Sequence, residues 1–254
     1  LAFFTFNKGL PLSIRSIFYP LLGDRTWGWF GHVVDIVAVL ATLFGLATSL
    51  GLGAQQATSG INHVFGTDGG IGMQLVVIAV VTFLATMSVI RGINGGVKVL
   101  SNINMLVALG LLIFVTIAGG MAGIKAIPTA LMGYIENFIP LSNPHGRGDE
   151  TWMQGWTVFY WAWWMSWSPF VGMFIARISK GRTIREFIVA VLFIPTTVII
   201  IWMAIFGGIA IDQVANKVGE IGVNGLQDIT LSLFHTYDAL PMSSMLSVVS
   251  IGLI

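Results

Sequence analysis

The sequence predicts an all-α membrane protein that crosses the bilayer several times. Apolar residues make up 56% of the 254 residues and charged residues only 9%, whereas soluble domains carry roughly 25% charged residues. Long apolar runs alternate with connections that contain glycine, proline and asparagine. Because a helix needs about 20 mostly apolar residues to cross the hydrocarbon core, each long run can form one transmembrane helix.

Five complete spans and two partial ones are expected, all in one transmembrane domain over residues 1–254. The chain begins without methionine and stops inside an apolar run, so we interpret it as an internal piece of a longer protein. The segment 127–141 is short and bounded by prolines, and it predicts a helix at the membrane interface, with an ordered loop as the alternative. The complete spans are residues 33–53, 73–90, 99–122, 155–176 and 187–211, and the partial spans are residues 1–6 and 243–254.

The basic residues support this division and predict an orientation. Nine of the twelve lysines and arginines fall on one set of alternate connections, which the positive-inside rule places in the cytoplasm. Most of the acidic residues fall on the opposite set. The cytoplasmic group is Lys8, Arg15, Arg25, Arg91, Lys98, Arg177, Lys180, Arg182 and Arg185, and the outer group is Lys125, Arg147 and Lys217.

Several classes of function are excluded by composition and motif. The chain has no cysteine, which removes disulfides and thiolate metal sites. Its net charge of +1 argues against nucleic-acid binding. No phosphate-binding glycine loop, HExxH or GxSxG motif occurs in a suitable context, so we expect neither an enzyme nor a cofactor. The four histidines are scattered along the sequence, at His32, His63, His145 and His235.

An aromatic run in the span 155–176, "FYWAWWMSWSPFVGMF" (159–174), is the strongest functional feature. On a helix its rings fall within an arc of roughly 100° and extend over about 16 Å. An interfacial belt is only about 5–8 Å deep, and helix interfaces favour small residues. The run can therefore be an interfacial belt, a packing surface between helices, or a site for a cation. The third interpretation is possible because desolvated Trp and Tyr rings bind quaternary ammonium groups. The residues of this arc are Trp156, Tyr160, Trp163, Trp164 and Trp167.

Pro169 lies two residues beyond Trp167 and predicts a break in the helix. Proline removes one helical hydrogen bond, which would leave the carbonyl of Met165 free. Inside a bilayer, such a carbonyl must find another donor or face a cavity, as in the broken helices of transporters. A simple structural kink is the alternative.

The segment "WTVFYWAWWMSWSPFVGMFIARISKGRTIREF" (156–187) closely resembles the signature of the betaine/choline/carnitine transporter family. In addition, "DIVAVLATLFGLATSLGLGAQQ" (35–56) resembles the fifth of that family's twelve helices, and "GVKVLSNINM" (96–105) resembles the connection into the seventh. The resemblance covers nearly the whole chain and would make the five spans helices five to nine. It implies part of a five-plus-five inverted-repeat (LeuT-type) transporter fold.

The resemblance also implies roles for the aromatic residues. The family binds trimethylammonium compounds in an aromatic box, in which Trp164 would be the member supplied by this chain. Trp163 and Trp167 would line the adjoining pathway, and Tyr160 shares their face. The remaining members of the box would lie on the fourth helix, before Leu1.

An ion site is implied only in part. In family members that use sodium, one ion site is formed by two threonines four residues apart and by the Phe of an "SPF" segment. Thr42 and Phe170 match this pattern, but Leu46 replaces the second threonine and offers no oxygen ligand. Sodium coupling is therefore expected from the retained "SPF", while proton coupling and ion-independent exchange remain the alternatives.

Two charged features carry further hypotheses. Asp35 is an acid at the inner end of a span, where it could carry a proton or favour the N-terminus of its helix from the first turn. The basic connection "ARISKGRTIRE" (176–186) is either an orientation signal or a gate that bridges cytoplasmic segments or lipid headgroups. Arg177 and Arg182 are its candidate gating residues.

The sequence therefore predicts a multi-pass protein of a bacterial cytoplasmic membrane that imports a quaternary-ammonium osmolyte. The resemblance implies glycine betaine as the substrate, taken up by alternating access for osmoprotection, with Na⁺ as the coupling ion. Proton-coupled choline uptake and carnitine/betaine exchange are the alternatives on the same fold, and a membrane ligand sensor is the alternative of another class. Expected partners are the substrate and the lipid bilayer, with a homotrimer implied by the family and no nucleic acid.

Overall fold

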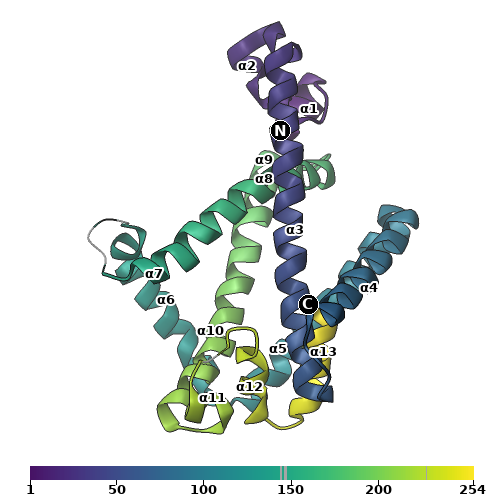
Figure 1. Cartoon of the computed structure of the whole chain (residues 1–254). Helices are drawn as coiled ribbons and strands as arrows, with labels where there is room; N and C mark the ends of the chain where they lie inside the picture. The colour runs from purple at the N-terminus through teal and green to yellow at the C-terminus, as the bar shows by residue number, and fades with distance from the viewer. Residues whose placement is uncertain (144, 146–147, 227) are drawn as a thin grey trace. The chain divides into compact units, whose positions relative to one another are not determined.

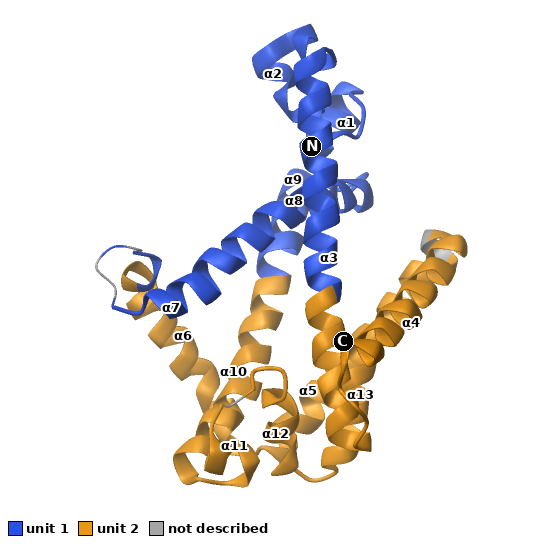
Figure 2. Cartoon of the chain, in the orientation of Figure 1, with its two compact units in different colours: residues 1–50, 141–194 blue, residues 51–140, 195–254 orange. Residues whose placement is uncertain are grey.

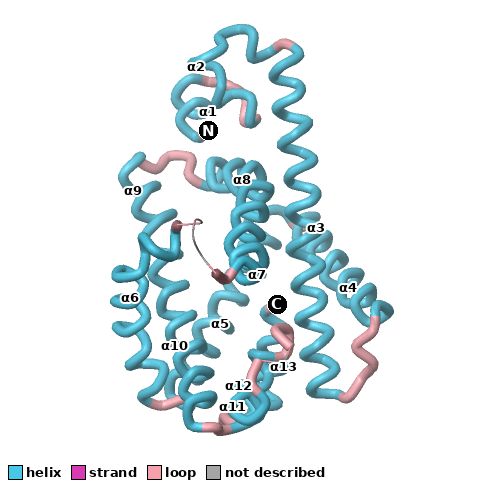
Figure 3. The backbone as a smooth tube through the Cα atoms, turned by 60° about the vertical axis from the view of Figure 1, so that its left-hand side comes forward, coloured by secondary structure: helices cyan, strands magenta, loops and turns pink. Residues whose placement is uncertain are grey.

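The computed structural model describes residues 1–143, 145, 148–226 and 228–254, so Arg147 lies outside the described residues. Within these ranges every regular element is a helix (Figures 1 and 3). The chain divides into two compact units, residues 1–50 with 141–194 and residues 51–140 with 195–254 (Figure 2).

The first unit consists of short helices at its start and the long helices α3 and α8. Its helix α3 continues into the second unit, and α8 is preceded without interruption by the π-helical turn η4. The elements are α1 (Ala2–Lys8), η1 (Ile14–Phe18), α2 (Tyr19–Leu22), η2 (Gly23–Trp27), α3 (Trp29–Phe65), α7 (Glu150–Trp152), η4 (Met153–Val158), α8 (Phe159–Ile178), α9 (Ile184–Ile188) and the π-helical turn η5 (Val189–Phe193).

The second unit holds the remaining long helices and three short helices near the end of the chain. The elements are α4 (Ile71–Ile90), the π-helical turn η3 (Ile93–Val97), α5 (Lys98–Ala118), α6 (Met121–Ser142), α10 (Ile194–Asn216), α11 (Gly219–Asn224), α12 (Ser232–Asp238) and α13 (Ser243–Leu253).

Four helical segments of the described chain are long and apolar enough to cross a membrane. They overlap four of the five expected spans. The fifth expected span, 155–176, forms η4 and α8 but is not among them, because its Trp, Tyr and Ser residues lower the mean hydropathy. The four segments are Trp29–Phe65, Ile71–Ile90, Gly95–Ala118 and Ile184–Asn216.

These helices expose most of their apolar side chains. At most 11% of each apolar stretch is buried within the chain, and in α4 the share is zero. A helix that is apolar all round is stable only inside a large protein or a membrane. The structure is therefore that of an all-helical, polytopic membrane protein, as expected from the sequence.

The region after α5 differs from the sequence prediction at two points. The span 99–122 was placed too long, since α5 ends at Ala118 and Gly120 adopts a left-handed backbone with φ of 63°, which glycine reaches without a steric cost. The prolines expected to bound the segment 127–141 instead lie inside α6 (Met121–Ser142). Each proline costs one hydrogen bond, and the other residues of this 22-residue helix outweigh that loss.

The second unit has an apolar core at the contact of α5, α10, α12 and α13. Small residues let α6 approach α10: a β-carbon at Gly123 would lie 3.2 Å from Ile205. The hydroxyl of Tyr237 shares a 2.8 Å hydrogen bond with Ser250, and burial raises the pKa of Tyr237 to about 12, although that hydrogen bond acts against the shift. The buried core residues are Leu111, Val115, Ile205, Phe206, Ile209, Tyr237 and Leu246.

Candidate substrate and ion site

The contact of α3 with α8 positions the aromatic residues. The indole Nε1 of Trp163 donates a hydrogen bond to the hydroxyl of Ser49 at 2.9 Å, and that hydroxyl donates to the carbonyl of Gly45 at 2.9 Å. Gly45 lets the two helices approach closely, since a β-carbon there would lie 3.1 Å from Ser166 Oγ and 3.4 Å from Trp167 Cδ1. The small residues that the sequence repeats along α3 thus admit the backbone and rings of α8.

These contacts establish that α3 and α8 run antiparallel. From Ser49 to Gly45, α3 goes back by one turn, and its partners on α8 advance by one turn, from Trp163 to Ser166 and Trp167. Further along in the same directions, Met173 of α8 lines the same pocket as Thr42 of α3.

Continued by one turn from Gly45, this direction leads from Ser166 and Trp167 toward the turn of α8 that contains Phe170, so we infer that Thr42 faces that turn. The hydroxyl of Thr42 donates to the carbonyl of Ala38 at 2.8 Å, which leaves its lone pairs available to a cation. Leu46 lies at the level of Ser166, whose hydroxyl donates to the carbonyl of Trp163 at 2.7 Å and retains acceptor capacity. The residues therefore fit a Na⁺ ion in part, with two hydroxyl groups one turn apart and no oxygen from Leu46.

Four rings form a continuous cluster along η4 and the first half of α8. Trp156 and Tyr160 stack with centroids 6.0 Å apart and planes at 12°, and Tyr160 lies 5.7 Å from Trp163. Phe159 contacts both Tyr160 and Trp163. The structure thus brings together two of the four predicted substrate residues, Tyr160 and Trp163.

The other two predicted substrate residues lie apart from this cluster. Trp167 packs against Phe170, with centroids 6.3 Å apart. Trp164 is 66% exposed and makes no ring contact with any described residue. Since consecutive helical residues are turned by 100°, the contact of Trp163 with α3 directs Trp164 away from α3.

The break predicted at Pro169 does not occur. Helix α8 continues through the proline from Phe159 to Ile178. The hydroxyl of Ser168 donates to the carbonyl of Met165 at 2.9 Å and so replaces the missing N–H of the proline. The hypothesis that free backbone groups at this position bind substrate is therefore wrong for this conformation.

Asp35 is paired with an arginine in the structure. Helix α3 begins at Trp29, so Asp35 lies in its second turn and the first-turn interpretation was wrong. The Nε of Arg15 lies 2.5 Å from one carboxylate oxygen of Asp35, and the backbone N–H of Arg15 donates to the other at 3.2 Å. Asp35 and Thr42 line one pocket of about 300 Å³.

The basic connection after α8 is ordered by its own residues. Thr183 and Glu186 form a reciprocal capping box at the start of α9, in which each side chain accepts a hydrogen bond from the other's backbone N–H. Within the described chain, neither Arg177 nor Arg182 forms an ion pair. Their gating role stays a prediction.

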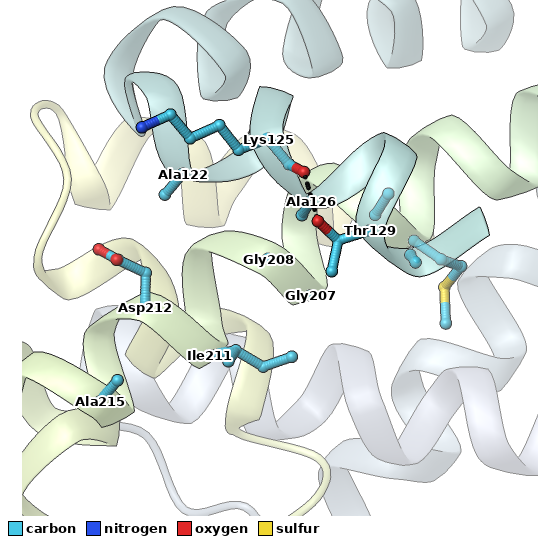
Figure 4. Close-up of a pocket in the computed structure, with 12 residues that line it drawn as sticks. Ala122, Lys125, Ala126, Thr129, Gly207, Gly208, Ile211, Asp212 and Ala215 are labelled. Atoms are coloured by element: carbon cyan, nitrogen blue, oxygen red, sulfur yellow. Dashed lines mark hydrogen bonds between the residues drawn. The ribbon is translucent and has the colours of Figure 1, made fainter. Parts of the chain in front are cut away.

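A second pocket, of about 460 Å³, lies between α6 and α10 (Figure 4). Lys125 and Thr129 line it from α6 and Asp212 from α10, while most of its surface is apolar. No aromatic ring is among its described lining residues, so it lacks the group that favours a quaternary ammonium ion.

The sequence reasoning missed one cluster of polar side chains. Two of the histidines that are scattered in the sequence, His63 and His235, lie together with Asp238. The only signal was the spacing of His235 and Asp238, three residues apart on one helix.

The similarity of this chain to known proteins extends over its whole length. The family described as "BCCT, betaine/carnitine/choline family transporter" matches residues 1–254. A glycine betaine/proline/choline/ectoine transporter of Vibrio parahaemolyticus is 70% identical over 100% of this chain and 45% of its own length. "Glycine betaine transporter 1" of the same species is 69% identical (100% and 49%), and a glycine betaine transporter of Bacillus subtilis is 42% identical (100% and 50%). The chain spans about half the length of these curated relatives.

Proposed function

The chain belongs to the betaine/carnitine/choline transporter family, and from this premise we propose that the whole protein is a secondary active transporter that imports glycine betaine. The names of three similar relatives include glycine betaine, and one of these names adds proline, choline and ectoine. The proposed transporter works by alternating access on a five-plus-five inverted-repeat fold, forms a homotrimer, and serves osmoprotection.

The aromatic face of α8 supports this substrate class. A trimethylammonium group has no N–H to donate, so ring faces recognise it better than hydrogen-bond acceptors do. The 66% exposed indole of Trp164 offers such a face. Trp163 is held by Ser49, which fixes the rotation of α8 and therefore the direction of Trp164.

Sodium is the coupling ion that we propose. The antiparallel direction of α3 and α8 supports this proposal, because it leads the turn of Thr42 toward the turn of α8 that contains Phe170. Ser166 of α8 would supply, from the opposite helix, the oxygen that Leu46 cannot offer. The second candidate is proton-coupled choline uptake, for which Asp35 is the available carboxylate, but its pairing with Arg15 favours a structural role.

The test is uptake of radiolabelled glycine betaine by the full-length protein in liposomes. Uptake is followed under an inward sodium gradient, under a proton gradient and with neither. Trp164→Leu is compared with Trp161→Leu, a matched control that is also 66% exposed but lies outside the aromatic arc. Because a desolvated cation–π contact contributes about 2 kcal/mol, we expect an affinity loss of at least about tenfold in Trp164→Leu and none in the control.

Each outcome separates the candidates. Uptake that follows the sodium gradient supports the proposal. Uptake that follows only the proton gradient would mean that coupling depends on a group other than Thr42. Equal losses in both tryptophan variants would contradict the aromatic box. Binding without uphill accumulation would identify a membrane sensor in place of a transporter.

A further inference from the structure

Three side chains that can bind a metal ion meet in the second unit, between the end of α3 and α12. His63 comes from α3, and His235 and Asp238 come from α12. One ligand atom of each lies within 4.8 Å of the other two. The Nε2 of His63 is 3.1 Å from Oδ1 of Asp238, and the two imidazole centroids are 5.5 Å apart.

We propose that His63, His235 and Asp238 bind a divalent transition-metal ion of the Zn²⁺ class, with water as the fourth ligand. Two imidazoles and one carboxylate are a ligand set that zinc accepts, with bonds of about 2.0–2.2 Å in a tetrahedron. Such a tetrahedron keeps its ligand atoms about 3.5 Å apart. Side-chain rotations that move the ligand atoms by about 1 Å would bring the three atoms from their present spacing to that geometry.

The two segments that carry the ligands are held together independently of any metal. A β-carbon at Gly60 would collide with the ring of Phe234, which is fully buried, so the glycine lets α12 approach α3 closely. The hydroxyls of Ser59 and Thr230 share a 2.8 Å hydrogen bond beside it. Phe234 also packs against the His63 ring, with centroids 6.0 Å apart. A site on fixed segments loses little freedom when an ion binds.

The positions of the ligands suit an ion that arrives from solvent. His235 and Asp238 are three residues apart and therefore share one face of α12. The side chains of His63 and Asp238 are 24% and 33% exposed. By the distribution of basic residues, both segments lie on the outer side of the membrane. Imidazole ligands favour Zn²⁺, Cu²⁺ and Ni²⁺, whereas Mg²⁺ and Ca²⁺ prefer oxygen ligands.

The simplest alternative is that His63 and Asp238 form only a pair. Such a pair needs two residues, whereas the proposed site needs His235 as well. Variants of His235 therefore separate the two readings, and they leave the contact of His63 with Asp238 in place.

The test uses the full-length protein, purified in detergent and freed of metal. Binding of Zn²⁺ alone and of Mg²⁺ alone is measured by equilibrium dialysis for the wild type, His235→Ala and the control His32→Ala, which changes an exposed histidine of α3 in the other unit. We expect one Zn²⁺ site in the wild type and in the control. The affinity should fall at least about tenfold in His235→Ala, because even losses in the outer shell of a metal site cost that much. Mg²⁺ should not bind.

A rescue variant guards against a trivial loss of folding. The chain contains no cysteine, and a thiolate is a good zinc ligand, so His235→Cys should restore the site. An unchanged midpoint of thermal unfolding in detergent shows that each variant is folded. The proposal is overturned if the wild type binds no Zn²⁺, if His235→Ala binds as the wild type does, or if folded His235→Cys fails to bind.

Discussion

The two compact units of the chain bury different kinds of side chain. In the unit with α5, α10 and α12, large apolar side chains such as Phe206 and Leu246 are almost completely buried. In the unit with α8, the buried apolar side chains of the described residues are two alanines, Ala38 and Ala176. The unit with α5, α10 and α12 is stabilised by its own core, whereas the unit with α8 leaves large aromatic rings such as Trp161 and Trp164 exposed.

The same contrast applies to the aromatic residues. Trp202 stacks on Phe206 with centroids 4.7 Å apart inside the core, and nothing in that packing suggests a binding role. On α8 the rings of Trp161 and Trp164 are both 66% exposed. The aromatic residues of the described chain are therefore of two kinds, those packed in the core and those exposed on α8.

The largest effect on stability should come from a change in the core. We expect Phe206→Ala to lower the free energy of unfolding by about 3–5 kcal/mol, because it removes packing and leaves a cavity. Phe44→Ala, at a phenylalanine of the other unit that is 70% exposed, should cost far less. Thermal unfolding of the two variants in detergent measures the difference. Equal losses would mean that the first unit also packs around its aromatic rings.

A smaller effect should come from the bond that orients α8. Trp163→Phe and Ser49→Ala each remove the 2.9 Å hydrogen bond between α3 and α8, which contributes about 1 kcal/mol. Because both variants delete the same bond, the double variant should lose no more than either single one. Uptake and thermal unfolding, compared across this double-mutant cycle, provide the measurement. Fully additive losses would show that the two side chains act independently.

An effect of similar size at neutral pH, but with an additional dependence on pH, should come from Tyr237. Burial raises its pKa to about 12 in the folded state, whereas an unfolded tyrosine titrates near 10. The unfolded state therefore loses this proton first, and the stabilisation by neutral Tyr237 should be complete below pH about 10 and fall as the pH rises to about 12.

The matched variant is Tyr237→Phe. It should cost about 1 kcal/mol at neutral pH through loss of the hydrogen bond to Ser250, and it should remove the part of the alkaline slope due to this tyrosine. Unfolding by denaturant between pH 8 and about 12, the range over which the group titrates, gives both quantities. An unchanged slope in the variant would contradict the assignment.

Much of the fold was predictable because it depends on local properties of the chain. Apolar runs of helical length predicted the helices of α4 and α10, and helical periodicity predicted that the rings of α8 share an arc. Two local predictions failed for local reasons. The hydroxyl of Ser168 replaces the hydrogen bond that Pro169 removes. Helix α5 ends at Ala118, just before the left-handed Gly120, which is earlier than hydropathy indicated.

The sequence by itself determined the class of the protein, the family to which it belongs and the aromatic character of α8. Only the tertiary structure decided that Trp163 meets Ser49 while Trp164 faces away, and that His63 meets Asp238 across 175 positions of the chain. The physical reason is the distance along the chain over which each property is determined. Hydropathy and helical phase are set by neighbouring residues, whereas the choice between two adjacent rings depends on where a glycine on another helix lets the backbones approach.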